Sequence, residues 1–177
     1  MLQLTGCLAV FLPPYALSIG ASTSAAFYMS TVLNAATFFG RFMLGQFADK
    51  CGPWNTIVLI TFICGVLNFA WTAVNTNAGL WVWAALYGFF SGAIASIQGP
   101  CNLILCPQPK AKLLGAWIAI GSVFSAVGCL GGEPVAGRLV KLHGDFKPAM
   151  HFAGATLLIS AAVFAVDRIW ISRAARL

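Results

Sequence analysis

The chain contains very little charge. Of its 177 residues only 8% are Asp, Glu, Lys or Arg, and just four are acidic, whereas 60% are hydrophobic. A soluble domain carries roughly 25% charged residues, so this shortage excludes a water-soluble globular protein. The net charge of +6 is spread along the chain and forms no basic run with interleaved aromatics, which excludes a nucleic-acid-binding protein. We therefore predict an all-α integral membrane protein.

Histidines and paired cysteines are also scarce. There are two histidines and six cysteines, and no two cysteines are spaced as Cys-x-x-Cys. Metal centres and di-iron membrane enzymes need clusters of such ligands. An intramembrane serine protease would need Gly-x-Ser-Gly, and the nearest match, Gly88–Gly92, is one residue too long. We expect no enzyme activity, no metal and no cofactor.

Long apolar segments dominate what is present. A membrane-spanning helix needs about 20 mostly apolar residues. Six candidates are separated by polar, Gly or Pro breaks: Leu2–Ser18, Thr23–Ala48, Asn55–Val74, Gly79–Leu105, Leu113–Leu142 and Pro148–Ile171. We predict that residues 1–177 form a single six-helix bundle. The first segment is the shortest and contains Pro13-Pro14, as if the chain began inside a helix.

The basic residues set the expected orientation, because Lys and Arg are enriched on the cytoplasmic side of a membrane. With the N-terminus in the cytoplasm, that side carries Arg41, Lys50, Lys110, Lys112, Arg168, Arg173 and Arg176. The outer side carries only Arg138, Lys141 and Lys147. We expect a multi-pass protein of the plasma membrane with both termini in the cytoplasm.

Arg41 is the strongest candidate for a functional residue. It precedes the end of its helix by about seven residues, hence by ~10 Å, and a charge at that depth is costly and often functional. Snorkelling to the headgroups and a structural salt bridge are the alternatives. Asn34 and Thr37 share the face of Arg41, because the three residues are spaced at i, i+3 and i+7. Hydrogen bonds between helices would also explain such polar residues.

The fourth segment carries a second polar stripe, whose members lie on one side of a helix: Tyr87, Ser91, Gln98 and Asn102. Gly99-Pro100 should bend this helix. The stripe would line a substrate path or form a packed polar seam, because lipid would leave it unsatisfied. Glu133, near the far end of the fifth segment, is expected at the outer interface.

The segment Gly40–Gly52 contains a recognisable motif, Gly-x-x-Ala-Asp-Lys-x-Gly after Gly-Arg. It resembles the helix 2–3 loop signature of the major facilitator superfamily, which recurs in weaker form at the helix 8–9 loop. The basic pair that usually follows the last glycine is replaced by Pro53-Trp54. The resemblance implies a conformational latch formed by Gly45, Asp49, Lys50 and Gly52.

Within that superfamily, the chain is most similar to the C-terminal half of the fungal monocarboxylate transporter-like branch. Leu33–Arg41 resembles its eighth helix, Tyr87–Gly92 its tenth and Gly132–Gly137 its eleventh. The resemblance implies that the six helices correspond to helices 7–12 of a twelve-helix transporter. It also implies that Arg41 engages a substrate carboxylate. Thr37 stands where proton-coupled members have an aspartate.

The function implied is transport of small organic anions, monocarboxylate-like, by alternating access. Gly40-Arg41 and Gly137-Arg138 are consistent with a 3+3 repeat inside this half. The expected partners are the lipid bilayer, the anion, and a missing N-terminal six-helix bundle or a second copy. The alternative is a truncated, non-transporting membrane protein or interaction partner that needs a second bundle.

Overall fold

The computed structural model describes residues 4–74, 76–105 and 114–174, and all its regular elements are helices. In chain order these are α1 (Leu4–Ser18), α2 (Thr23–Cys51), α3 (Pro53–Trp71), α4 (Asn77–Leu105), α5 (Leu114–His143) and α6 (Lys147–Ala174). Each coincides with one of the six segments expected from the sequence, and the bounds differ by at most three residues. The all-α prediction is therefore confirmed.

The limits of α2 follow from its capping residues. The hydroxyl of Ser22 accepts a hydrogen bond from the backbone N–H of Ala25 at 3.2 Å, which satisfies one free donor of the first turn. At the other end Gly52 has φ +90° and its N–H donates to the carbonyl of Ala48 at 2.9 Å. Pro53 then begins α3, a position where its missing N–H costs nothing. One glycine thus joins two long helices.

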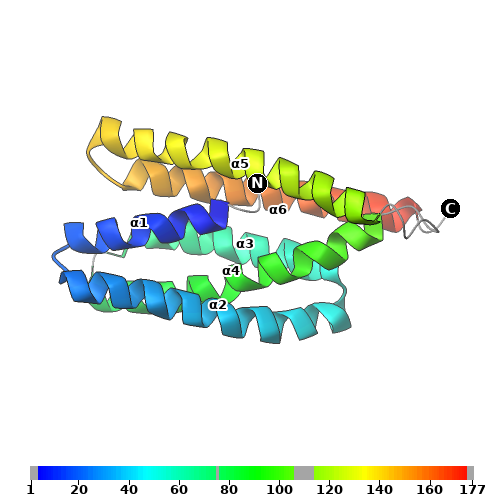
Figure 1. Ribbon diagram of the computed structural model, residues 1–177, viewed down its shortest axis with the longest axis horizontal. Coiled ribbons are helices and arrows are strands. Elements are labelled where there is room, and N and C mark those ends of the chain that lie inside the picture. The colour runs from blue at the N-terminus through cyan, green and yellow to red at the C-terminus, as the bar shows by residue number, and fades with distance from the viewer. Residues whose placement is uncertain (1–3, 75, 106–113, 175–177) are drawn as a thin grey trace.

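The helices run along the long axis of the molecule, and their connections alternate between its two ends (Figure 1). The α2–α3 turn and the C-terminal end of α6 lie at one end, and the α1–α2 and α5–α6 connections lie at the other. The α2–α4 and α3–α6 pairs form the most extensive contacts. The end with the α2–α3 turn therefore also holds Lys50 and Arg168, which the sequence places on one side of the membrane.

Four of the described helices, α3 to α6, are long and apolar enough to cross a membrane. The sequence predicts six spans, so α1 and α2 differ from the expectation. α1 has only 15 residues, about 22 Å of helix. α2 has 29 residues, but Ser, Thr, Asn, Gln and Arg side chains are distributed along it and lower its hydropathy. These polar groups suit a helix that faces protein or water along part of its length.

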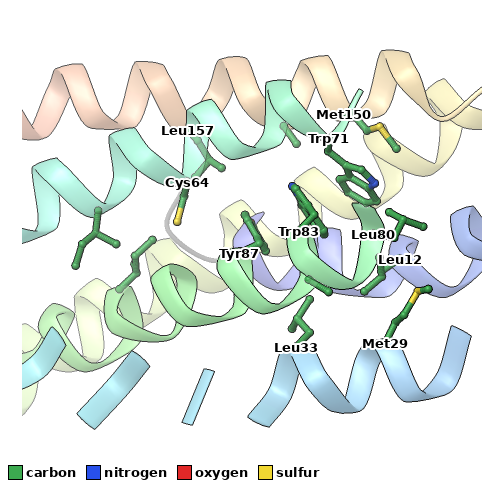
Figure 2. Packing of buried hydrophobic residues seen from close by; sticks show 14 of the residues in the cluster. Leu12, Met29, Leu33, Cys64, Trp71, Leu80, Trp83, Tyr87, Met150 and Leu157 are labelled. Atoms are coloured by element: carbon green, nitrogen blue, oxygen red, sulfur yellow. The ribbon is translucent and has the colours of Figure 1, made fainter. Parts of the chain in front are cut away.

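The core contains an aromatic stack between α3 and α4. The rings of Trp71 and Trp83 lie 4.2 Å apart, and those of Trp83 and Tyr87 lie 4.8 Å apart (Figure 2). The indole N–H of Trp83 donates to the carbonyl of Leu67 at 2.8 Å. Tyr15 of α1 packs edge-on against Trp71 and donates its hydroxyl to the carbonyl of Val74 at 3.0 Å. This cluster fixes three helices relative to one another.

Candidate functional site

A seam of glycines fixes the orientation of α2. Gly40, Gly88 and Gly92 lie where α2 and α4 cross, and a Cβ atom at any of them would overlap backbone of the other helix: Phe89 for Gly40, Leu33 for Gly88 and Thr37 for Gly92. Only small residues allow two helix backbones to approach this closely. The seam therefore determines which side of α2 turns away from the rest of the bundle.

Arg41 lies on the side that turns away. Gly40 is buried and Arg41 is exposed, because consecutive residues of a helix point about 100° apart. Asn34 is exposed on the same side, and Thr37 is half-buried at its edge. The three residues lie in one uninterrupted helix, as the sequence predicts.

The polar neighbours of Arg41 are satisfied by their own helix. The amide of Asn34 donates to the carbonyl of Ser30 at 2.9 Å, and the hydroxyl of Thr37 donates to that of Leu33 at 2.9 Å. Among the residues that the structure describes, Arg41 has no hydrogen bond and no ion pair. The described carboxylates of Asp49, Asp145 and Asp167 therefore do not form the structural salt bridge that the sequence leaves open.

Two aromatic side chains lie on the same side of α2 as Arg41, and they are not among the residues predicted from the sequence. Phe27 and Phe38 are 68% and 70% exposed. At about 100° per residue they fall within ~60° of Arg41 on the helix. Phe27, Asn34, Phe38 and Arg41 are spaced at i, i+7, i+11 and i+14, and this spacing is the sequence signal that could have revealed them. The face of α2 thus combines one cation with polar and aromatic groups.

The polar stripe of α4 is divided by the fold. Tyr87 is fully buried in the aromatic stack, so within this chain it belongs to the core and is separated from the face of Arg41. Ser91 is half-buried and donates to the carbonyl of Gly88 at 3.2 Å. Gln98 is also half-buried. Asn102 lies in α4, but its side chain is outside the part that the structure describes, as is that of Glu133 in α5.

The latch residues lie at the end of α2. Nothing approaches the position of a Cβ at Gly45 within 4 Å, so within the described residues no neighbouring helix packs against this glycine. Asp49 and Lys50 are exposed, and neither side chain forms a hydrogen bond or an ion pair with another described residue. Gly52 adopts a positive φ, which supports its role in the turn. Within the described ranges, no three His, Cys, Asp or Glu side chains lie close enough together to hold a metal ion.

Comparisons with known proteins identify transporters among the relatives. No family model matches the chain. An MFS-type transporter of Aspergillus fumigatus is 38% identical over 164 residues, which are 92% of this chain and 37% of that protein. The aspyridones efflux protein apdF of Emericella nidulans is 36% identical over 84% of this chain and 30% of its own length. The MFS-type transporter pynF of Aspergillus niger is 32% identical over 90% of this chain and 38% of its own length.

The chain thus spans about a third of the length of the curated relatives it matches. The similarity covers most of the chain, including α2, α4 and the glycine seam between them. Together with four helices apolar enough to cross a bilayer, these relatives identify a multi-pass membrane protein. Over about nine-tenths of its length, this protein is related to the MFS-type transporters of fungi.

Proposed function

We propose that the chain forms one helical bundle of a major facilitator transporter for small organic anions, corresponding to the C-terminal half of a monocarboxylate-like carrier. The observation that carries this proposal is Arg41, an exposed cation on a polar and aromatic face of α2, which packs against the apolar, membrane-spanning helix α4. A charge inside a membrane is costly unless it meets water or a counter-ion. An organic anion would supply that counter-ion.

The chemistry of arginine suits this role. A guanidinium holds a carboxylate through two parallel hydrogen bonds and cannot lose its charge. Phe27 and Phe38 on the same face would contact the apolar part of such a substrate. Thr37, Asn34, Ser91 and Gln98 remain candidates for further polar contacts.

The names of two relatives suggest the direction of transport. One is the aspyridones efflux protein and another the agnestins efflux protein of Paecilomyces divaricatus. By analogy, the substrate of the present protein is an organic metabolite carried out of the cell. Alternating access would then require a second bundle that faces α2 and rocks against it.

Transport measurements on the complete polypeptide that contains this chain test the proposal. Arg41→Gln keeps the size and polarity of the side chain and removes its charge. We expect kcat/KM for a labelled monocarboxylate or an acidic metabolite to fall on the order of 10- to 100-fold, the value of a hydrogen bond to a charged group. Arg138→Gln, which removes an exposed cation from α5, is the matched control.

Cysteine accessibility tests whether Arg41 faces water. In a background without native cysteines, Arg41→Cys should react with a polar thiol reagent, and substrate should slow the reaction. A variant that stays unreactive would contradict the proposal. Equal transport by Arg41→Gln and Arg138→Gln would contradict a role of Arg41 in binding the anion. A complete polypeptide that transports no organic anion at all would favour the non-transporting role.

A further inference from the structure

An open groove lies between α3 and α6. Its volume is about 540 Å³. α3 contributes Val58, Leu59 and Phe62, and α6 contributes three alanines and Arg168. The proposed transport function uses none of these residues.

The groove results from a change of side-chain size along α6. Near the middle of the pair the two helices are in close contact, because Gly65 of α3 packs against Leu158 and Gly154 of α6 packs against Phe69. Nearer the C-terminal end of α6, its contact face consists of Ala161, Ala162 and Ala165. Their single methyl groups leave the space between the helices unfilled.

The two ends of the groove differ in chemistry. Its walls are apolar, and its polar residues, Asn55 and Arg168, lie at the end where α3 begins and α6 approaches its last turns. From Leu158 to Arg168 the groove follows about 15 Å of helix. This length is comparable with half of a hydrocarbon core of ~30 Å. A long apolar groove that ends at a cation is complementary to an amphipathic ligand with a negatively charged end.

The neighbouring residues place the polar end at the membrane interface. Trp54, in the first turn of α3, is half-buried against Phe164 of α6, with ring centroids 6.3 Å apart. Its indole nitrogen is buried and has no hydrogen-bond partner among the described residues. Tryptophan is enriched at headgroup level, and exposed apolar side chains of α3 and α6, including Phe62 and Val163, continue toward the other end. This outer face suits contact with lipid.

We propose that the groove binds a phospholipid with an anionic headgroup. One acyl chain would lie along Leu59, Phe62 and the alanines of α6. Arg168 would hold the phosphate by charge-assisted hydrogen bonds. Charge complementarity supports this occupant, because Asp167 does not line the groove and Arg168 is its charged lining residue. The site goes beyond the proposed transport function and does not depend on it.

Native mass spectrometry of the purified full chain tests this site. Phosphatidylserine and phosphatidylcholine with identical acyl chains are titrated against the protein in detergent. We expect tighter binding of phosphatidylserine. Arg168→Gln should weaken that binding by about fivefold, the effect expected for one basic side chain near an anionic lipid surface. Lys50→Gln removes an exposed cation at the same end of the bundle but outside the groove, and should leave the affinity for phosphatidylserine unchanged.

A second pair of variants tests whether an acyl chain lies in the groove. Ala162→Leu fills the groove and should lower the affinity for both lipids. Ala155→Leu adds the same side chain at an exposed position of α6 outside the groove and should leave both affinities unchanged. The proposal is overturned if Arg168→Gln and Lys50→Gln behave alike. It is also overturned if the Ala162→Leu and Ala155→Leu variants bind both lipids with equal affinity. Filling the groove would then have no effect on lipid binding, and the groove would have another occupant.

Discussion

Gly40 and Arg41 are adjacent in the sequence and have opposite positions in the structure. Gly40 lies against the backbone of Phe89, and Arg41 points away from the bundle. Because one residue corresponds to about 100° of rotation, the close contact at Gly40 determines where the charge of Arg41 lies. A substitution at the glycine would therefore displace the arginine as well.

At the residue scale, the sequence predicts the breaks between helices to within three residues, but the residues that form the helix ends are identified only in the structure. Ser22, Gly52 and Pro53 mark the ends of helices because capping, positive φ and the missing proline N–H act within one turn. Tyr87 shows the limit of such reasoning. Periodicity placed it on one side of α4 with Ser91 and Gln98, but could not determine whether Trp83 and Trp71 or a substrate path lies on that side.

Gly45 and Gly52 should respond differently to the same substitution. Gly52→Ala places a side chain at φ +90°, where an L-residue costs about 1–3 kcal/mol, so the thermal unfolding temperature should fall. Gly45→Ala should leave it unchanged or raise it, since alanine favours a helix by roughly 0.5–1 kcal/mol over glycine and the position is open. Differential scanning fluorimetry of both variants provides the measurement.

The same two variants, Gly45→Ala and Gly52→Ala, also test whether these glycines belong to a conformational latch. If Gly45 admits a neighbour from another bundle, Gly45→Ala should lower the transport rate of the complete polypeptide while keeping its thermal stability. Normal transport by Gly45→Ala would remove Gly45 from the latch. A Gly52→Ala variant as stable as the natural chain would show that the turn adopts another backbone conformation.

At the scale of the element, α2 combines two requirements. On one face, the side chains must be small enough for the backbone of α2 to contact the backbone of α4. The other face carries polar, charged and aromatic side chains. The sequence predicts the helix and the clustering of Asn34, Thr37 and Arg41, because both follow from spacing along one element. It could not predict the partner of each face, because pairing of α2 with α4 depends on residues more than forty positions apart. The 3+3 repeat likewise remains a prediction, and Gly137 in α5, unlike Gly40, faces open space.

The seam between α2 and α4 should be sensitive to side-chain size. Gly88→Leu would force its Cβ into the backbone at Leu33, and overpacking of this kind costs typically 1–3 kcal/mol or more. We expect lower expression, a lower unfolding temperature and loss of transport. Gly131→Leu in α5 is the control, because that position is exposed and nothing lies within 4 Å of its Cβ site. Equal stability of the two variants would contradict the close contact.

At the scale of the whole molecule, two surfaces need different surroundings. The outer face of α3 and α6 is apolar and suits lipid along its length. The outer face of α2 carries Arg41, Asn34 and Thr37, and lipid would leave such groups unsatisfied. A bundle with one apolar side and one mixed side is complete only when protein or water covers the mixed side. The length of the relatives, of which the chain spans about a third, is consistent with a covering bundle elsewhere in the same polypeptide.

The size of the native polypeptide tests this arrangement. We expect an immunoblot with an antibody against the C-terminal residues to detect a product at least twice the length of the present 177 residues. In that product, a cysteine at the exposed position Phe38 should cross-link to a second cysteine outside the present chain.

A product of 177 residues would contradict a covering bundle in the same polypeptide. The mixed face of α2 would then require a second copy, and Phe38→Cys should form a disulfide-linked dimer. A product of 177 residues whose Phe38→Cys variant forms no disulfide-linked dimer would leave Arg41 facing lipid. The transport proposal would then fail as well.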